Sequence, residues 1–152
     1  MKKYLFTFLI ALIIGFLFSN FFLKQYDDYN GIKVSNVGEN LYFIQYGVFS
    51  NLDSLEENTI SLQNYVYNKQ DNLYYVYVGI TKLEENAKKI VNYYKKNGTE
   101  TILKEFAITN KEFLDALTNY DEILKNTEDE NVISSVLNQT LSKYEEVVIN
   151  GG

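Results

Sequence analysis

The chain has 152 residues, with 14 Lys, 20 acidic residues and a formal net charge of −6. It contains no Cys and no His, which excludes disulfides, thiolate metal sites, Cys nucleophiles and the commonest general base. The lysines form no clustered footprint of the kind that a phosphate backbone requires, so nucleic acid is not expected as a partner.

An apolar segment opens the chain. Residues 4–23 carry no charge, and as a helix they would rise about 30 Å, the thickness of the hydrocarbon core of a bilayer. Lys2 and Lys3 precede them, which predicts a cytoplasmic N-terminus and an extracytoplasmic remainder. We interpret residues 1–24 as a single-pass transmembrane signal anchor in the cell membrane. A cleaved signal peptide is the alternative, but the apolar run is long for one and no Ala-x-Ala-like site follows it. Residues 25–39 are expected to be a short linker.

The first folded elements are a strand over residues 41–49 and a helix over about residues 52–64. The strand segment is rich in aromatic and β-branched residues, which favour sheets. Side chains alternate between the two faces of a strand, so Phe43, Gln45 and Phe49 are expected on one face.

A hairpin comes next. Residues 65–67 and 73–78 have the composition of strands, and residues 68–72 between them are typical of a turn. Residues 65–67 could instead form the last turn of the preceding helix.

The remaining elements of this part are a helix and a strand. A capping box at residues 81–84 opens the helix, Gly98 ends it, and residues 101–109 form the strand. The order strand, helix, hairpin, helix, strand predicts an α+β fold for residues 40–109, with a four-stranded antiparallel sheet and two helices on one face. The other face of the sheet would meet solvent or a ligand.

An acidic helical hairpin is predicted at the C-terminus, over residues 110–152. A second capping box lies at residues 109–112, and the segment 109–152 holds 3 Lys against 9 acidic residues. The apolar stripes of residues 110–148 need a partner, which could be each other, the sheet or another protein.

The predicted sheet domain contains a loose internal repeat. Residues 42–58 and 74–86 share one plan, in which an alternating strand is followed by Gly, a short cap and an acidic helix start. Gly47 and Gly79 occupy equivalent points. Gly at such a point indicates a sharp exit from the strand or close packing of a helix on it.

At these residues the chain resembles the SPOR family, the sporulation-related repeat domain of bacteria. Residues 44–50, IQYGVFS, are similar to the family's first-strand pattern Val-Gln-x-Gly-x-Phe. Residues 76–81, VYVGIT, match the third-strand pattern Val-x-Val-Gly-Pro-Phe in part, because Ile80 and Thr81 stand where Pro and Phe are usual. Tyr75 stands where a basic residue is common.

The resemblance, over residues 40–108, implies a ferredoxin-like βαββαβ sheet that binds peptidoglycan at division or sporulation septa. The implied ligand is the glycan strand stripped of stem peptides, and the implied role is binding, not catalysis. On our strand register the uncovered face displays Phe43, Gln45, Tyr75 and Tyr77. Gln45 matches the family's glutamine, whereas the aromatic residues follow from alternation and could cover flat sugar rings. Alternatively, Phe43 packs beneath the C-terminal hairpin, which would then cover the sheet.

A second hypothesis is an extracytoplasmic scaffold that binds a protein partner through residues 110–148, with the SPOR-like domain as a spacer. A wall hydrolase is not expected, because we find no pair of acids placed to flank a cleft. No cofactor and no metal site are expected either, since the acidic run at residues 127–131 lacks the twelve-residue spacing of a Ca²⁺ loop.

Overall fold

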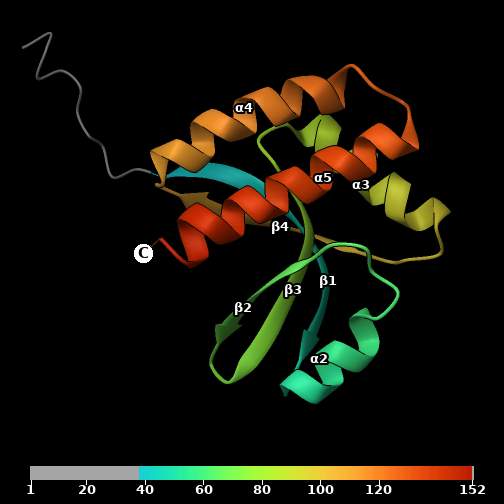
Figure 1. Cartoon of the computed structure of the whole chain (residues 1–152), viewed down its shortest axis with the longest axis vertical. Coiled ribbons are helices and arrows are strands. Elements are labelled where there is room, and N and C mark those ends of the chain that lie inside the picture. The colour runs from blue at the N-terminus through green and yellow to red at the C-terminus, as the bar shows by residue number, and fades with distance from the viewer. Residues whose placement is uncertain (1–37, 152) are drawn as a thin grey trace, which may run out of the picture. The chain divides into compact units, whose positions relative to one another are not determined.

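Four antiparallel strands form one sheet in the computed structural model, which describes residues 38–151. The strand order is β2-β3-β1-β4, which is compatible with a ferredoxin-like fold and confirms the predicted antiparallel sheet (Figure 1). The strands are β1 (Glu39–Phe49), β2 (Val66–Gln70), β3 (Leu73–Thr81) and β4 (Ile102–Ile108).

The helices are α2 (Leu52–Thr59), α3 (Glu84–Lys96), α4 (Lys111–Lys125), α5 (Glu130–Tyr144) and a closing π-helical turn, η1 (Glu145–Ile149). The predicted helical hairpin is therefore present as α4 and α5, which lie side by side across one half of the sheet (Figure 1). Helix α2 is shorter than predicted and ends at Thr59. The next two residues, the β-branched Ile60 and Ser61, have lower helix propensity than Ala or Leu.

The predicted hairpin is formed by β2 and β3. Its turn is only two residues long, and both Asp71 and Asn72 have positive φ angles, of 50° and 62°. This is the backbone that a tight type I′ turn between twisted strands requires, and Asn and Asp adopt it more readily than most residues. Val66 opens β2 opposite Tyr77, so the alternative in which residues 65–67 end a helix is wrong.

Two irregularities in the register of β1 change the predicted alternation. The β1–β3 pairing shifts between Ile44 and Gln45 and again between Gln45 and Gly47. As a result Val48 lies opposite Tyr75, on the same face as Gln45. The prediction that Phe49 shares the face of Gln45 is therefore wrong.

The ends of the helices follow the predicted signals in part. Gly98 ends α3 with a φ of 77°, and the Gly98 and Thr99 amides donate to carbonyls of its last turn, as predicted. The two capping boxes differ from the prediction. Asn110, not Thr109, caps α4 by accepting from the Phe113 amide at 2.9 Å, and the α3 N-cap makes no side-chain hydrogen bond.

Gly79 allows close packing of helices on β3. A Cβ atom there would lie 3.0 Å from Ile90 of α3 and 3.3 Å from Leu137 of α5, closer than ordinary contacts. Gly47 has a different setting, because its nearest neighbour is the ring of Phe49 in its own strand. The interpretation as close helix packing is therefore confirmed for Gly79 alone.

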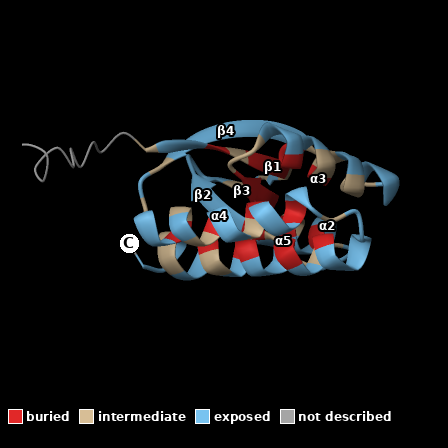
Figure 2. Ribbon diagram, turned by 90° about the horizontal axis from the view of Figure 1, so that it is seen from above, coloured by how far each residue is buried: buried red, intermediate tan, exposed pale blue. Residues whose placement is uncertain are grey.

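Helix α5 reaches both faces of the sheet at the end of β3. Strand β2 pairs with β3 only as far as Tyr77, and α5 packs against β3. Leu137 of α5 joins a core cluster with Ile44, on the face that also carries Gly79, whereas Tyr144 joins the cluster of Phe43 on the opposite face. Figure 2 shows buried residues gathered between the strands and the helices α4 and α5.

The predicted anchor at residues 1–24 and almost all of the linker at residues 25–39 lie outside the described residues. Within residues 38–151, no helix is long and apolar enough to cross a membrane. These residues belong to one compact unit, Val37–Gly152, in which the helical hairpin and the sheet share their core.

Candidate functional site

The four predicted ligand-binding residues lie together on one face of the sheet, here called the Phe43 face. Gln45 lies opposite Tyr77 in the β1–β3 pairing, and the rings of Phe43 and Tyr77 meet edge to face at 5.2 Å. Only 1% of Phe43 and 6% of Gln45 and of Tyr77 is exposed, while Tyr75 is half-buried. The sequence therefore predicted the grouping of these residues, whereas burial was considered only for Phe43, as an alternative.

The α4–α5 hairpin covers this part of the Phe43 face. Phe43, Tyr77 and Leu41 share a core cluster with four hairpin residues, namely Phe113, Leu117, Leu141 and Tyr144. The rings of Phe43 and Tyr144 lie 5.5 Å apart. The expectation of an open face is wrong here, and the alternative in which Phe43 packs beneath the hairpin is confirmed. The physical reason is that both surfaces are apolar, and burying them together gains about 25 cal/mol per Å².

The burial changes the acid–base behaviour of the tyrosines in this cluster. Burial raises the pKa of Tyr77 to about 12, and the nearby phenols of Tyr144 and Tyr75 add to the shift. Burial also raises the pKa of Tyr144. Both phenols are therefore neutral at physiological pH and can serve only as hydrogen-bonding or packing groups.

A buried polar cluster joins α4 to the end of β3, and it was not predicted from the sequence. The Asp121 carboxylate accepts hydrogen bonds from the Thr81 hydroxyl and, at 2.8 Å, from the Lys82 amide. The Asn86 side-chain amide donates to the Asp121 backbone carbonyl at 2.9 Å and to its carboxylate at 3.0 Å. Thr81, Asn86 and Asp121 are all at most 3% exposed. This cluster fixes the hairpin to the sheet, and only the fold reveals it, because Asp121 lies 40 residues from Thr81.

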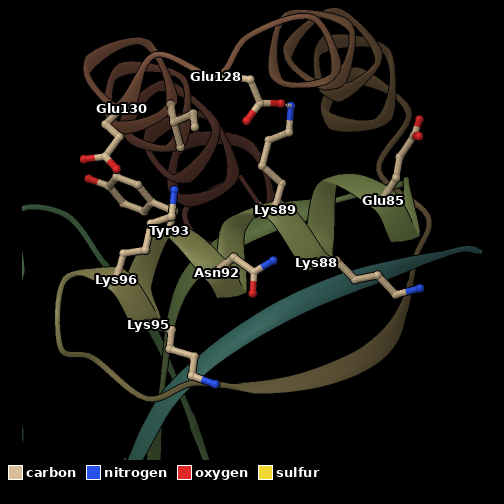
Figure 3. A pocket seen from close by; sticks show the side chains of 10 residues that line it. Glu85, Lys88, Lys89, Asn92, Tyr93, Lys95, Lys96, Glu128 and Glu130 are labelled. Carbon is tan, nitrogen blue, oxygen red and sulfur yellow. Dashed lines mark ion pairs between the residues drawn. The ribbon is translucent and has the colours of Figure 1, made fainter.

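Lys89 of α3 binds the C-terminal end of α4. Its Nζ donates to the carbonyls of Leu124 at 2.9 Å and Thr127 at 2.7 Å, and it pairs with Glu128 at 2.9 Å. Carbonyls at a helix C-terminus have no partner within the helix and carry partial negative charge, so a Lys there is stabilising. Figure 3 shows Lys89 reaching toward Glu128 in a cleft of about 550 Å³ that is lined by further Lys and Glu side chains.

Replacing Lys89 with Met should lower the free energy of unfolding by about 1–2 kcal/mol, because the carbonyls of α4 lose a charged donor. Chemical denaturation measures this loss. The matched control is Lys88→Met, one position away, since Lys88 is exposed and, among residues 38–151, forms an ion pair only with Glu84 in its own helix. We expect no measurable loss for Lys88→Met. Equal losses in the two variants would contradict the role of Lys89.

The rest of the Phe43 face is exposed and carries three apolar side chains together with polar ones such as Lys104, which lies opposite Phe43. Val48 and Phe106 are each 41% exposed and Ile102 is 58% exposed. Their pairing partners, Tyr75 for Val48 and Gln45 for Ile102, place them on the Phe43 face. We call Val48, Ile102 and Phe106 the apolar strip. Exposed apolar side chains that gather on one face of a sheet can mark a contact surface.

No group of three or more acidic side chains is arranged to hold a metal ion within residues 38–151. Comparison of the chain with protein-family models, with curated proteins and with solved structures found no match.

Proposed function

We propose that this protein is a membrane-anchored, extracytoplasmic SPOR-like protein that binds the glycan strands of peptidoglycan, at division or sporulation septa. The observation that carries the proposal is the pairing of the two motif strands. Strands β1 and β3 lie side by side at the centre of the sheet, with Gly47 opposite Val76 and Ile44 opposite Gly79. Two related strand–helix halves that meet in this way are what the internal repeat leads us to expect.

The location rests on the N-terminal charge pattern. An uncharged segment at residues 4–23 follows Lys2 and Lys3, which favours a single-pass anchor with the folded unit outside the cytoplasm. Strand β1 begins at Glu39, so few residues separate the anchor from the sheet. The folded unit would therefore lie close to the outer surface of the membrane, where new wall material is laid down.

The three departures from the SPOR patterns have a common physical explanation. Ile80 is fully buried in the cluster that the hairpin completes, and Thr81 donates to Asp121 of α4. Tyr75 packs against the same cluster. Each departure thus lies where the C-terminal hairpin meets the sheet, and each is consistent with a SPOR-like sheet that has gained a helical cover.

The α4–α5 hairpin limits which of the predicted residues can contact a ligand. Phe43, Gln45 and Tyr77 are buried beneath or beside it, so we propose that they support the sheet and do not touch glycan. Of the four predicted residues, only Tyr75 keeps partial exposure.

The proposal predicts that residues 37–152 sediment with purified peptidoglycan sacculi. More protein should pellet after amidase treatment, because removing the stem peptides uncovers the glycan strands. The control is an unrelated acidic protein of similar size and charge, since sacculi can retain proteins nonspecifically. Sedimentation no greater than that of the control, with both sacculus preparations, would refute glycan binding.

The apolar strip favours a second candidate function, an extracytoplasmic scaffold for a protein partner. The strip exposes Val48, Ile102 and Phe106 on one face. In contrast, inward residues of the hairpin such as Phe113 and Leu117 are fully buried, so residues 110–148 offer a partner less apolar surface than expected. A scaffold would therefore bind through the strip, and it would show no preference for amidase-treated sacculi.

A further inference from the structure

A hollow of about 360 Å³ lies between the loop after α2, the C-terminal end of α3, and α5. Its polar lining consists of side-chain amides and hydroxyls, from Ser61, Gln63, Asn64, Asn97, Thr99 and Ser134. Tyr93 and Tyr94 line it as well, and none of the described residues that line it is charged. On a chain in which 22% of the residues are charged, such a lining differs from the general surface.

A second hollow, of about 470 Å³, continues the first toward the end of β1. The two hollows share Ser61, Gly98 and Thr99 as lining residues. The second hollow adds the rings of Tyr46 and Phe49, whose centroids lie 6.4 Å apart. The two hollows therefore adjoin at the three shared residues, and each has aromatic side chains in its lining; we call the two together the groove. Each volume lies in the range of about 300–1,000 Å³ that is usual for ligand pockets.

The walls of the groove are held by hydrogen bonds. The Ser134 hydroxyl of α5 donates to the Gln63 side chain at 2.9 Å, which joins α5 to the loop after α2. The Tyr94 hydroxyl donates to the Val78 carbonyl at 3.1 Å, and the Tyr46 hydroxyl donates to the Asn58 carbonyl at 2.9 Å. A groove whose walls are already fixed loses little conformational entropy when a ligand binds.

The chemistry of the lining selects one class of ligand. Amide and hydroxyl side chains match the hydroxyls and acetamides of an N-acetylated sugar, and aromatic rings match its flat apolar faces. The neighbouring cleft of Figure 3 offers the contrast, because Lys and Glu side chains line it. Glu100 is the single charged residue among the described residues that line the groove.

We infer that this groove binds an oligosaccharide of N-acetylhexosamine units, with Ser61, Gly98 and Thr99 at its centre. The inference rests on the proposed glycan-binding function and names the surface that performs it. The groove lies away from the buried Phe43 and Tyr77, so glycan binding through it would need no movement of the hairpin. The shared residues of the two hollows allow one ligand to run along both of them.

The test uses residues 37–152, which form a compact unit by themselves, and the probe tetra-N-acetylchitotetraose. Titration followed by backbone amide NMR should shift the signals of residues 61–64 and 97–99. Ser61→Arg places a long charged side chain at the junction of the hollows and should weaken binding at least about tenfold. Ser135→Arg is the matched control, because Ser135 is exposed on α5 and lines neither hollow. It should bind like the unaltered protein.

A second variant tests the groove independently, in case Ser61→Arg does not fold. Asn64→Ala removes a lining amide that makes no hydrogen bond to another described side chain, and it should also weaken binding. Two results would contradict binding in the groove without contradicting glycan binding. One is NMR shifts confined to the apolar strip. The other is no NMR shifts although the protein still sediments with sacculi. If the probe binds in the groove but the protein does not sediment with sacculi, the peptidoglycan function is contradicted and the saccharide site is supported.

Discussion

Asp121→Ala should lower the free energy of unfolding by about 3 kcal/mol. The substitution removes the acceptor of the Thr81 hydroxyl and of the Lys82 amide, and one of the two acceptors of the Asn86 amide. A buried donor that loses its acceptor costs about 1–3 kcal/mol. Thr81 and Asn86 are fully buried, and the hydrogen bond from the Lys82 amide is partly buried. Urea denaturation followed by circular dichroism measures the loss.

Two controls separate the buried cluster from a general effect of changing α4. Asp115→Ala removes a carboxylate from the same helix at an exposed position, and it should stay within about 0.5 kcal/mol of the unaltered protein. Asp121→Asn keeps an acceptor oxygen for Thr81 but turns a donor toward the Lys82 amide, so its loss should be intermediate. A loss below about 0.5 kcal/mol for Asp121→Ala would show that the cluster does not fix the hairpin.

Phe43→Ala should lower the free energy of unfolding by about 3–5 kcal/mol, the usual cost of removing a buried aromatic ring. Phe43 lies at the centre of an aromatic group, 5.2 Å from the rings of Tyr77 and Phe106 and 5.5 Å from that of Tyr144. Removal of its ring leaves a cavity between the sheet and the hairpin. Thermal and chemical unfolding of the same sample measure the effect.

The control for this prediction is Phe106→Ala, on the same face of the sheet. Phe106 contacts Phe43 but is 41% exposed, so its loss should be less than half that of Phe43→Ala. Similar losses for both variants would mean that the hairpin does not cover Phe43 in solution. That result would restore the open face that the sequence predicted.

The local elements were predictable because their signals are local. Alternation and β-branched residues indicated the strands, Asp71 and Asn72 lie in the predicted turn, and Gly98 ends α3 as expected. The errors arise where a local rule meets a competing interaction. Thr81 was predicted to cap a helix, but its hydroxyl donates to Asp121. Two register shifts in β1 place Val48 on the face of Gln45, where simple alternation does not predict it.

The candidate site shows the limit of prediction most clearly. Alternation correctly grouped Phe43, Gln45 and Tyr77, because the side-chain period of a strand is a property of the chain itself. The amphipathic stripes of residues 110–148 likewise showed that those helices need a partner. Neither pattern identifies the surface of the sheet on which the helical hairpin packs.

By itself, then, the sequence determined the strands, the turn, the helical hairpin and the faces of most strand residues. The tertiary structure decided that α4 and α5 close over Phe43 and that Asp121 meets Thr81. It also decided that a groove lined mainly by uncharged side chains forms around Ser61 and Thr99. The physical reason is range: backbone preferences act over a few residues, whereas packing and buried hydrogen bonds join residues that only the fold brings together.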